Sequence, residues 1–390
     1  MHDVPWGHLF RVLVALVSVA VAVWPPSTDG PRATPAFVLG TASSEVPMFF
    51  LLLLVLPTVL AVGSSDLATP VGWVVAGLAT VAAAGLTWVQ VRAFAARSTV
   101  LASVDAALGA GGRPAPALRP AEWMRMVLAP IRVPALDVRV VHNLPYGPHG
   151  RANTLDLYRR RSRVNDAPVL VHLHGGGYYT GRKSQEARLL MQALARRGWV
   201  CVSANYRLTP TARFPETLTD AKRVIAWVRT EGAAYGAGTT VVVCGGSAGA
   251  NLAATAALTA GRRDLQPGFE DVDTAVQALV CLYGYYGPAP TDEMPSAPGD
   301  HLTADAPTTL LVHGALDPMV PAADARDFAQ RLRVTSASPV AYAEVPGMLH
   351  AFDRFDAVRH GGVTVGVLHF LDRLGLMPEH RVDAPEPEAR

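Results

Sequence analysis

The sequence predicts an α/β protein with a mostly parallel central sheet flanked by helices, preceded by an N-terminal helical transmembrane region. Three observations support this fold class. From Asp137 onward, strand-like and helix-like segments alternate, which is typical of a parallel sheet covered on both faces. A Gly-x-Ser-x-Gly turn at residues 245–249 joins an apolar β-branched run to a helical run of small residues. The N-terminal region contains two long runs without a charged side chain.

The composition places the chain outside the range of ordinary soluble enzymes. Half of the 390 residues are hydrophobic and only 17% are charged, and the formal net charge is +2. A charge so near zero gives no reason to expect a nucleic-acid partner. The three cysteines, Cys201, Cys244 and Cys281, lie in or at the end of apolar strand-like runs. Their spacing offers no metal site, and we expect buried free thiols.

The hydrophobic excess lies at the N-terminus. Leu67–Val91 is uncharged and long enough to cross a bilayer, and Val46–Ser65 is also uncharged. Two such runs in succession disfavour the alternative that they are buried core helices. Val12–Trp24 is shorter and could be the core of a signal peptide that ends near residues 20–22. Because its leading segment is poorly basic, we favour a third membrane helix, so the sequence predicts two to three spans.

The positive charges around these spans predict an orientation. With three spans, one side of the membrane would hold five arginines, Arg32, Arg92, Arg97, Arg113 and Arg119. Arg11 and the amino terminus would lie on the other side. The positive-inside rule then places the large C-terminal part in the cytoplasm, attached to a multi-pass membrane region. If the chain has only two spans, or if the first segment is cleaved, these charges no longer define this orientation.

The chain divides into four expected regions. Residues 1–95 form the transmembrane helices, and residues 96–136 form a linker with an interfacial or cap helix. In that interval, residues 109–120 have the Gly/Pro/Ala composition of a linker. The following residues, 121–134, could instead be a lid or a helix that merely packs on the next domain. Residues 137–377 form the catalytic domain, and residues 378–390, rich in Pro, Glu and Ala, form a disordered tail.

The catalytic part is expected to contain eight strands and five helices. The expected strands are Asp137–His142, Thr154–Tyr158, Pro168–Leu173, Trp199–Ala204, Thr239–Cys244, Ala275–Leu282, Thr308–His313 and Val340–Val345. The expected helices are Arg182–Arg197, Thr217–Arg229, Asn251–Ala260, Ala322–Arg333 and Val363–Leu374. In such a sheet the functional groups gather at the carboxyl ends of the strands.

Ser247 stands at the centre of the Gly-x-Ser-x-Gly turn, which has the features of a nucleophile elbow. Gly245 and Gly249 suit a turn that is too tight for side chains on both flanks. Ser247 would then stand at the head of a helix, whose N-terminal dipole favours the negative charge that develops during acyl transfer.

A run of three glycines, Gly175, Gly176 and Gly177, follows His174 at the end of an expected strand. Such a run frees backbone N–H groups to point at one spot, as the stabilisation of an oxyanion requires. The alternative is a flexible turn, which the later Gly-x-Ser-x-Gly turn disfavours.

Asp317 and His350 are the expected partners of Ser247. Each follows an expected strand, and they occur after the serine in the order acid, then histidine. His350 would take the proton from Ser247 and return it to the leaving group, and Asp317 would hold the imidazole tautomer. The alternatives are a turn or helix-cap role for Asp317 and a loop role for His350.

Three segments together resemble the hormone-sensitive-lipase-like α/β-hydrolases. They are residues 174–178 (His-Gly-Gly-Gly-Tyr), residues 205–210 with Phe214-Pro215 and Asp220, and residues 245–253. The resemblance covers roughly residues 137–374. It implies an α/β-hydrolase fold, a Ser-Asp-His triad and carboxylic-ester substrates. By position, the N–H groups of Gly176, Gly177 and Ala248 would form the oxyanion hole.

The sequence departs from this family in places. Gly246 stands where members often have Asp, Thr211 where many have Glu, and Ala250 where Gly is frequent. None of these changes removes a catalytic group. The stretch between residues 282 and 308 is short for the family, which leaves the shape of the acyl pocket open.

Other residues have weaker signals. Tyr178 and Tyr179 follow the glycine run and could line the ester pocket, with core packing as the alternative. Arg207 and Asp220 would form a structural ion pair beneath the site. His369 lies on an apolar helix and is expected to be packed.

These observations favour a membrane-anchored serine esterase or lipase that acts on short to medium acyl esters through an acyl-enzyme. Its partners would be a small-molecule or lipid ester and the bilayer, and the mechanism needs no metal or organic cofactor. The same triad could serve a methylesterase, an amidase or a deacetylase. A non-catalytic binding protein on a hydrolase scaffold would typically lack a triad member. A transporter is disfavoured because the apolar runs contain few polar groups besides Ser and Thr.

Overall fold

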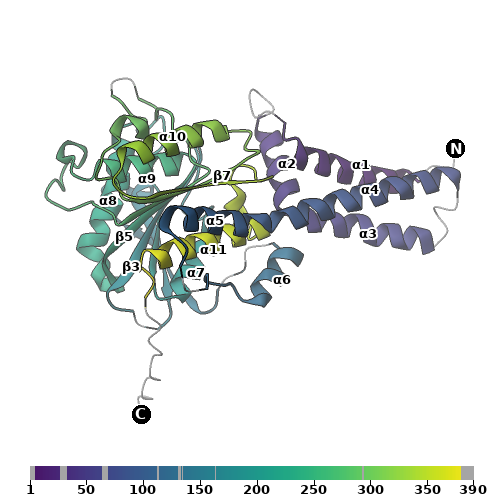
Figure 1. The fold of residues 1–390 in the computed structure, drawn as a ribbon, viewed down its shortest axis with the longest axis horizontal. Coiled ribbons are helices and arrows are strands. Elements are labelled where there is room, and N and C mark those ends of the chain that lie inside the picture. The colour runs from purple at the N-terminus through teal and green to yellow at the C-terminus, as the bar shows by residue number, and fades with distance from the viewer. Residues whose placement is uncertain are drawn as a thin grey trace, which may run out of the picture.

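The computed structural model describes residues 5–26, 33–63, 69–111, 114–130, 133, 135–162, 164–291 and 294–378. Arg32, Arg113 and all of the expected tail except Pro378 lie outside the described residues. Figure 1 shows an α/β body from which an arm of helices projects on one side, with the amino terminus near the tip of the arm.

The body is built on an eight-stranded sheet in the order β1-β2-β4-β3-β5-β6-β7-β8. Its strands are β1 (Val138–Pro145), β2 (Thr154–Arg160), β3 (Ala167–Leu173), β4 (Val200–Ala204), β5 (Ala237–Gly246), β6 (Ala278–Leu282), β7 (Thr308–Gly314) and β8 (Val340–Val345). Strand β2 pairs antiparallel with β1 and β4, and all other neighbours pair parallel. The expectation of a mostly parallel sheet is therefore confirmed.

Helices cover both faces of the sheet and account for its apolar strands. Strands β4 and β6 are buried along their whole length, as is usual for strands packed on both faces. One face packs against α8 (Glu216–Glu231), α9 (Ala248–Leu258) and α10 (Ala322–Thr335). The other packs against α5 (Ala95–Leu108), α7 (Arg188–Arg196) and α11 (Val358–Arg373). The two faces hold separate hydrophobic clusters.

Helix α5 is an addition that the sequence did not predict. It lies against α11 and β8, and its Val100 and Val104 are fully buried. Gly366 of α11 permits the close approach, because a Cβ there would overlap the side chain of Val100. His369, which was expected to be packed, lies 2.8 Å from Asp105 of α5. The interval 96–136 thus contains α5 and the short helix α6 (Pro120–Leu128).

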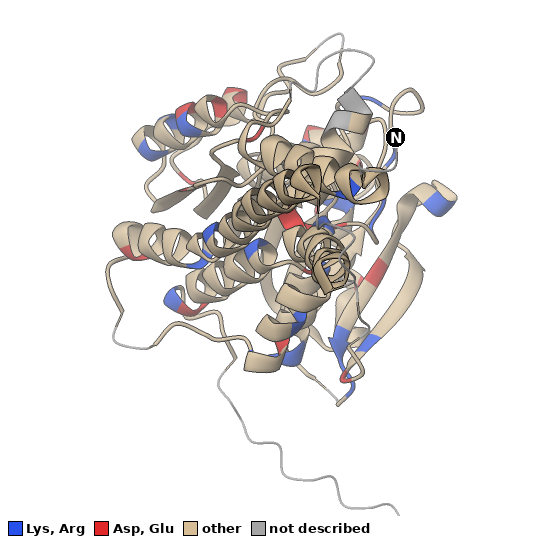
Figure 2. Cartoon of the chain, turned by 90° about the vertical axis from the view of Figure 1, so that its right-hand side faces the viewer, with Lys and Arg blue, Asp and Glu red and all other residues tan. Residues whose placement is uncertain are grey.

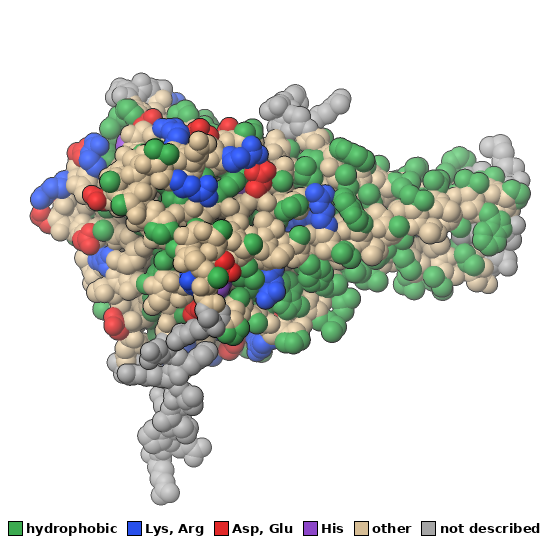
Figure 3. Space-filling model, in the orientation of Figure 1, with side chains coloured by type: hydrophobic (Ala, Val, Ile, Leu, Met, Phe, Trp, Pro, Cys, Tyr) green, Lys and Arg blue, Asp and Glu red, His purple; other side chains and the backbone are tan. Residues whose placement is uncertain are grey.

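The arm consists of α1 (Trp6–Val23), α3 (Pro47–Gly63) and α4 (Pro70–Ala93), with α2 (Ala33–Glu45) at its root. Two helical stretches, Trp6–Val23 and Pro70–Leu108, are long and apolar enough to cross a membrane. The pair α2–α3, bent by 74°, gives a third candidate. Figure 2 looks toward the arm and shows its helices largely without charge, and Figure 3 shows charged side chains gathered on the body.

The helix expected at residues 182–197 begins later, at Arg188. The preceding residues form turns that hold neighbouring loops. The backbone N–H of Lys183 donates to Asn205, and the Glu186 carboxylate accepts from the N–H of Gly175. Tertiary hydrogen bonds therefore replace the first turns of the helix that the amphipathic pattern predicts.

Candidate active site

Ser247 lies in the sharp turn between β5 and α9, with a backbone conformation of φ 53° and ψ −121°. A non-glycine residue rarely adopts a positive φ, and such strain is concentrated at functional sites. A Cβ on Gly245 would overlap the backbone of Gly249, and a Cβ on Gly249 would overlap the carbonyl of Leu173. The two flanking glycines are therefore required by the close packing of backbone around the turn.

The structure brings Ser247, His350 and Asp317 into one hydrogen-bonded chain. The Nε2 atom of His350 lies 2.9 Å from the Oγ atom of Ser247. Its Nδ1 atom lies 2.6 Å from the Oδ2 atom of Asp317. The three residues follow β5, β8 and β7, whose carboxyl ends meet at one edge of the sheet. This is the geometry in which a histidine can accept a proton from the serine hydroxyl.

Asp317 is held as a carboxylate although its side chain is fully buried. Its Oδ1 atom accepts hydrogen bonds from the N–H groups of Met319 and Val320, each at 2.9 Å. Burial alone would raise the pKa, but His350, His313 and these hydrogen bonds outweigh it and hold the pKa of the Asp317 carboxyl below its usual range. The acid is thus ionised and fixed beside the imidazole.

The glycine run forms a loop directly beside Ser247. Gly176 and Gly177 have φ angles of 124° and 62°, which favour glycine. A Cβ on Gly175 would lie 3.1 Å from the Cβ of Ser247. Within the described part of the chain, no acceptor pairs with the N–H groups of Gly176, Gly177 or Ala248. All three residues line the cavity that also contains Ser247, so backbone donors without an acceptor border the same cavity as the serine hydroxyl.

Buried polar side chains hold the glycine loop in place. The Oε2 atom of Glu186 accepts from the N–H of Gly175 at 2.6 Å, and the hydroxyl of Tyr206 donates to the carbonyl of His174 at 2.8 Å. The rings of His174 and Tyr206 are stacked, with 4.4 Å between centroids. Burial, reinforced by the nearby Asp353, raises the pKa of the Glu186 carboxyl to about 7.

Tyr283 and Asp353 support the histidine. The ring of Tyr283 meets the His350 ring edge-on at 4.8 Å, and its hydroxyl donates to the Oδ1 atom of Asp353 at 2.6 Å. The Oδ2 atom of Asp353 accepts from the N–H of Ala187. The sequence motifs did not point to Glu186 or Tyr283. Tyr283 could have been identified from its position directly after a buried strand. The sequence around Glu186 contains no motif that indicates its role.

A cavity of about 620 Å³ opens onto the Ser247 hydroxyl. Its wall is mainly apolar and aromatic, and it includes Phe37, Val38, Tyr178, Tyr179, Tyr283, Tyr285, Pro288, Pro290, Met319 and Val320. Tyr178 and Tyr179 both lie in this wall. Tyr178 is buried and donates to Asn251 at 2.6 Å, whereas Tyr179 is exposed. The expected ion pair between Arg207 and Asp220 is present, with two side-chain hydrogen bonds and a third from the backbone N–H of Arg207.

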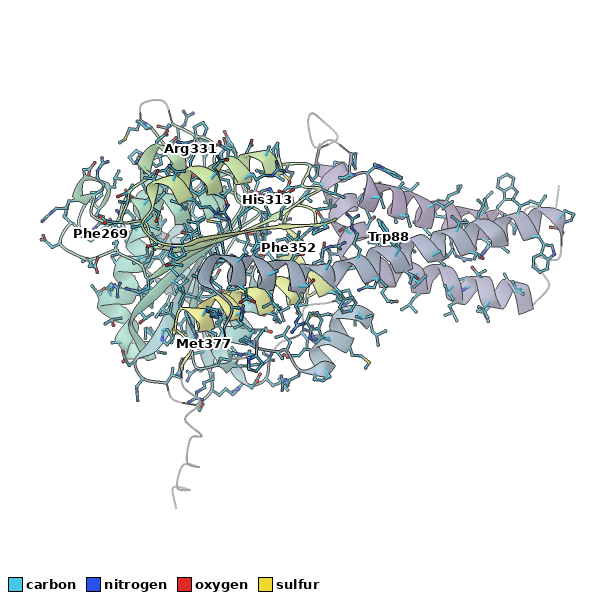
Figure 4. The ribbon with its side chains drawn as sticks, viewed as in Figure 1. Trp88, Phe269, His313, Arg331, Phe352 and Met377 are labelled. Atoms are coloured by element: carbon cyan, nitrogen blue, oxygen red, sulfur yellow. The ribbon has the colours of Figure 1, made fainter. Side chains whose placement is uncertain are left out.

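Helix α2 also contributes to the site, which the sequence did not predict. The ring of Phe37 lies 6.3 Å from the ring of His350, and the guanidinium of Arg354 lies over Phe37 at 5.3 Å. Figure 4 places His313 and Phe352, close in sequence to Asp317 and His350, on the side of the body nearest the arm. The candidate site therefore lies at the junction of the body and the arm.

The structure describes no metal centre. Among the described residues, no group of three or more His, Cys, Asp or Glu side chains is arranged to hold a metal ion. The three cysteines are free and buried in the sheet.

The chain was compared with known proteins. The sequence model of the BD-FAE family matches residues 155–296. The probable carboxylic ester hydrolase LipM of Mycobacterium tuberculosis is 32% identical, and the alignment covers 97% of each chain. The esterase LipQ of the same organism is 39% identical over 59% of this chain and 61% of its own length.

Solved esterase structures share the fold of the body. Thermogutta terrifontis esterase 2 superposes with a TM-score of 0.54 at 24% identity, over 62% of this chain and 96% of its own. A truncated carbohydrate esterase from gut microbiota gives a TM-score of 0.54 at 21% identity, over 62% and 99%. With the elbow, the sheet order and the full-length similarity to LipM, these likenesses assign the chain to the hormone-sensitive-lipase-like α/β-hydrolase family of carboxylic ester hydrolases.

Proposed function

We propose that this carboxylic ester hydrolase is a membrane-anchored serine esterase or lipase. Ser247 would be its nucleophile, His350 its general acid and base, and Asp317 the carboxylate that orients the histidine. One observation carries this assignment: the hydrogen-bonded chain Asp317–His350–Ser247 ends at a hydroxyl in the apolar cavity.

The geometry supports an ordinary acyl-transfer cycle. His350 takes the proton of Ser247 as the oxygen attacks the ester carbonyl. The N–H groups of Gly176, Gly177 and Ala248 stabilise the resulting oxyanion. His350 then returns the proton to the departing alkoxide, which leaves an acyl-serine. Water attacks this ester with His350 again as the base, and the acid and the free Ser247 are released.

The cavity supports esters of short to medium acyl chains. Its volume of about 620 Å³ lies within the usual range for small-molecule sites, and its wall is mainly apolar and aromatic. An amide or methyl ester substrate would use the same machinery, so substrate comparison must decide between these leaving groups.

The length and composition of the arm support the proposal that it anchors the protein in a membrane. Helix α1 has 18 residues, about 27 Å at 1.5 Å per residue, which approaches the thickness of the hydrocarbon layer. Exposed tryptophans lie near both ends of α1 and α4: Trp6 and Trp73 near their first residues, and Trp24 and Trp88 near their last. Both helices run from the tip of the arm toward the body (Figure 1). Paired aromatic residues of this kind mark the two surfaces of a bilayer.

The charges support a cytoplasmic position for the body. Arg92 and Arg97 follow the membrane-crossing part of α4 on the side of the body, and the Arg92 guanidinium lies over the Trp88 ring at 5.0 Å. By the positive-inside rule, this side faces the cytoplasm. Three crossings by α1, α3 and α4 then put the amino terminus on the opposite side.

Hydrolysis by the full chain in nanodiscs tests the enzymatic part of the proposal. The substrates are a p-nitrophenyl ester series, a matching methyl ester and a p-nitroanilide. Replacement of Ser247 by Ala should lower kcat by about ten-thousand-fold or more, because no other nucleophile is in place. Ser162→Ala, at an exposed turn after β2, should leave the rate unchanged. Equal rates in wild type and Ser247→Ala would contradict the proposal.

A further inference from the structure

The candidate triad lies against the root of the membrane arm. A small crevice is lined by Pro25 and Pro26, directly after α1, together with Phe37 and Gly40 of α2. Its opposite wall consists of Pro318, Leu349 and His350. The chain that leaves the first membrane helix therefore lies beside the catalytic histidine. This places the site at the level where the arm would leave the bilayer.

The exposed rim of the ester cavity is mainly apolar, although Thr180 and Arg354 also line the cavity. Val38, Tyr179 and Met319 line the cavity and expose 58%, 63% and 48% of their surface, and Pro288 is exposed beside them. Exposed apolar surface is unfavourable in water and favourable next to lipid. An apolar rim around a site entrance is typical of a surface that contacts another apolar phase.

Helix α2 joins this rim to the membrane helices. Val38 lies in the cavity wall, while α2 follows α1 and precedes α3. Arg359 of α11 fixes the helix to the body, because its guanidinium donates to the carbonyl of Ser44 and lies 3.3 Å from Glu45. Both partners of this ion pair are buried. The side of the rim that contains Val38 is therefore held at the root of the arm, opposite the body loops that contain Tyr179 and Met319.

We propose that the cavity opens at the bilayer surface and takes its substrate from the membrane. The substrate class is a bilayer-resident lipid ester whose carbonyl lies at headgroup depth, and it enters between α2 and the rim formed by Tyr179 and Met319. This inference rests on the function proposed above. Hydrolysis consumes one water and gives an acid and an alcohol, and the acyl or alcohol product with the longer chain returns to the bilayer.

The first test compares two esters with the same leaving group. The full chain is assayed in phosphatidylcholine nanodiscs with p-nitrophenyl butyrate in the water and with p-nitrophenyl decanoate, a medium-chain ester, in the bilayer. A carboxylate at the rim should oppose entry from lipid, so Val38→Glu and Met319→Glu should lower the decanoate-to-butyrate ratio of kcat/KM about ten-fold or more. The control Val334→Glu, at an exposed site on α10, should keep the ratio of the wild type.

The outcomes of this assay are distinct. An unchanged ratio in both rim variants would overturn the membrane entrance. So would a wild-type enzyme that hydrolyses the butyrate but leaves the decanoate in the bilayer untouched, and that result would leave the esterase assignment intact. Loss of both reactions in the wild type would overturn the esterase assignment and the entrance with it.

A second measurement locates the rim without an enzymatic readout. The three native cysteines are buried, so a spin label attaches selectively to Val38→Cys or, as a control, to Val334→Cys. In nanodiscs, the label at position 38 should be more accessible to oxygen than to a water-soluble nickel complex, and the label at position 334 should show the reverse. A label at position 38 that behaves like the control would overturn the proposal.

Discussion

Glu186 is a carboxyl buried beneath the glycine loop, with its pKa raised to about 7 by burial and by Asp353. The unfolded value is about 4.3, so the folded state binds this proton more tightly than the unfolded state does. The resulting stabilisation is complete below the unfolded pKa and is lost as the pH rises through 7. Arg354, 3.7 Å away, offsets only part of the cost of ionisation.

Glu186→Gln should therefore change the pH dependence of stability. The amide oxygen can still accept the Gly175 N–H, but it cannot ionise. Between pH 5 and pH 8.5, the free energy of unfolding should fall less in the variant than in wild type, by on the order of 2 kcal/mol. Denaturant unfolding at several pH values measures this difference, with the exposed Glu231→Gln as the control. The same slope in Glu186→Gln and wild type would refute the argument.

The candidate triad could be located from the sequence because each member follows a strand with a local motif. Ser247 lies in the elbow, and Asp317 and His350 lie just after β7 and β8. Their catalytic roles remain predictions. Glu186 and Phe37 reach the site only through tertiary packing, from segments that local patterns assigned to a helix interior or to no element.

Helix α5 is structurally part of the body, although it continues the line of α4 (Figure 1). Its buried face packs on α11 and β8 and closes one side of the sheet. We propose that the boundary between arm and body lies at Phe94, between these two helices. Helix α5 was not predicted because the difference in hydrophobicity between its buried and exposed faces is small. The buried face consists of alanine and valine, and alanines also occur on the exposed face.

Gly366→Val should destabilise the body by disturbing this contact. The new side chain would overlap Val100, and overpacking of a buried site costs about 1–3 kcal/mol. The midpoint of denaturant unfolding measures the effect in the full chain. Gly261→Val, where no neighbouring atom lies within 4 Å, is the matched control. If both variants unfold at the same midpoint, the packing role assigned to α5 is incorrect.

The strands were predictable because buried parallel strands form short continuous apolar runs. The first residue of α7 and the whole of α2 were not predictable from the sequence. At α7 the chain forms tertiary hydrogen bonds instead of helical ones. Helix α2 falls between two longer apolar runs and has little amphipathic contrast of its own.

At the scale of the whole molecule, the arm and body form a single elongated shape with the site at their junction (Figure 3). In the proposed topology, three crossings would separate the tip of the arm from the body by one bilayer. That arrangement would explain the apolar composition, which is costly for a soluble protein of this length.

The proposed topology predicts opposite labelling of two positions. Gly63→Cys lies at the tip of the arm and Val334→Cys lies on the body, and both sites are exposed. A membrane-impermeant maleimide added to intact cells should label only Gly63→Cys, and inverted vesicles should show the reverse. The buried native cysteines give the background control. The proposed topology has one crossing, by α4, between these two positions. Labelling of both from the same side would require an even number of crossings between them and would contradict that topology.

The central claim is that Ser247 is the nucleophile of an esterase, and covalent capture tests it most directly. The full chain is treated with a fluorophosphonate and digested, and the modified peptide is identified by mass spectrometry. We expect one adduct, on Ser247. It should be absent from Ser247→Ala, and an ester substrate should slow its formation in the wild type. An active esterase that carries the adduct on another serine, or takes none, would contradict it.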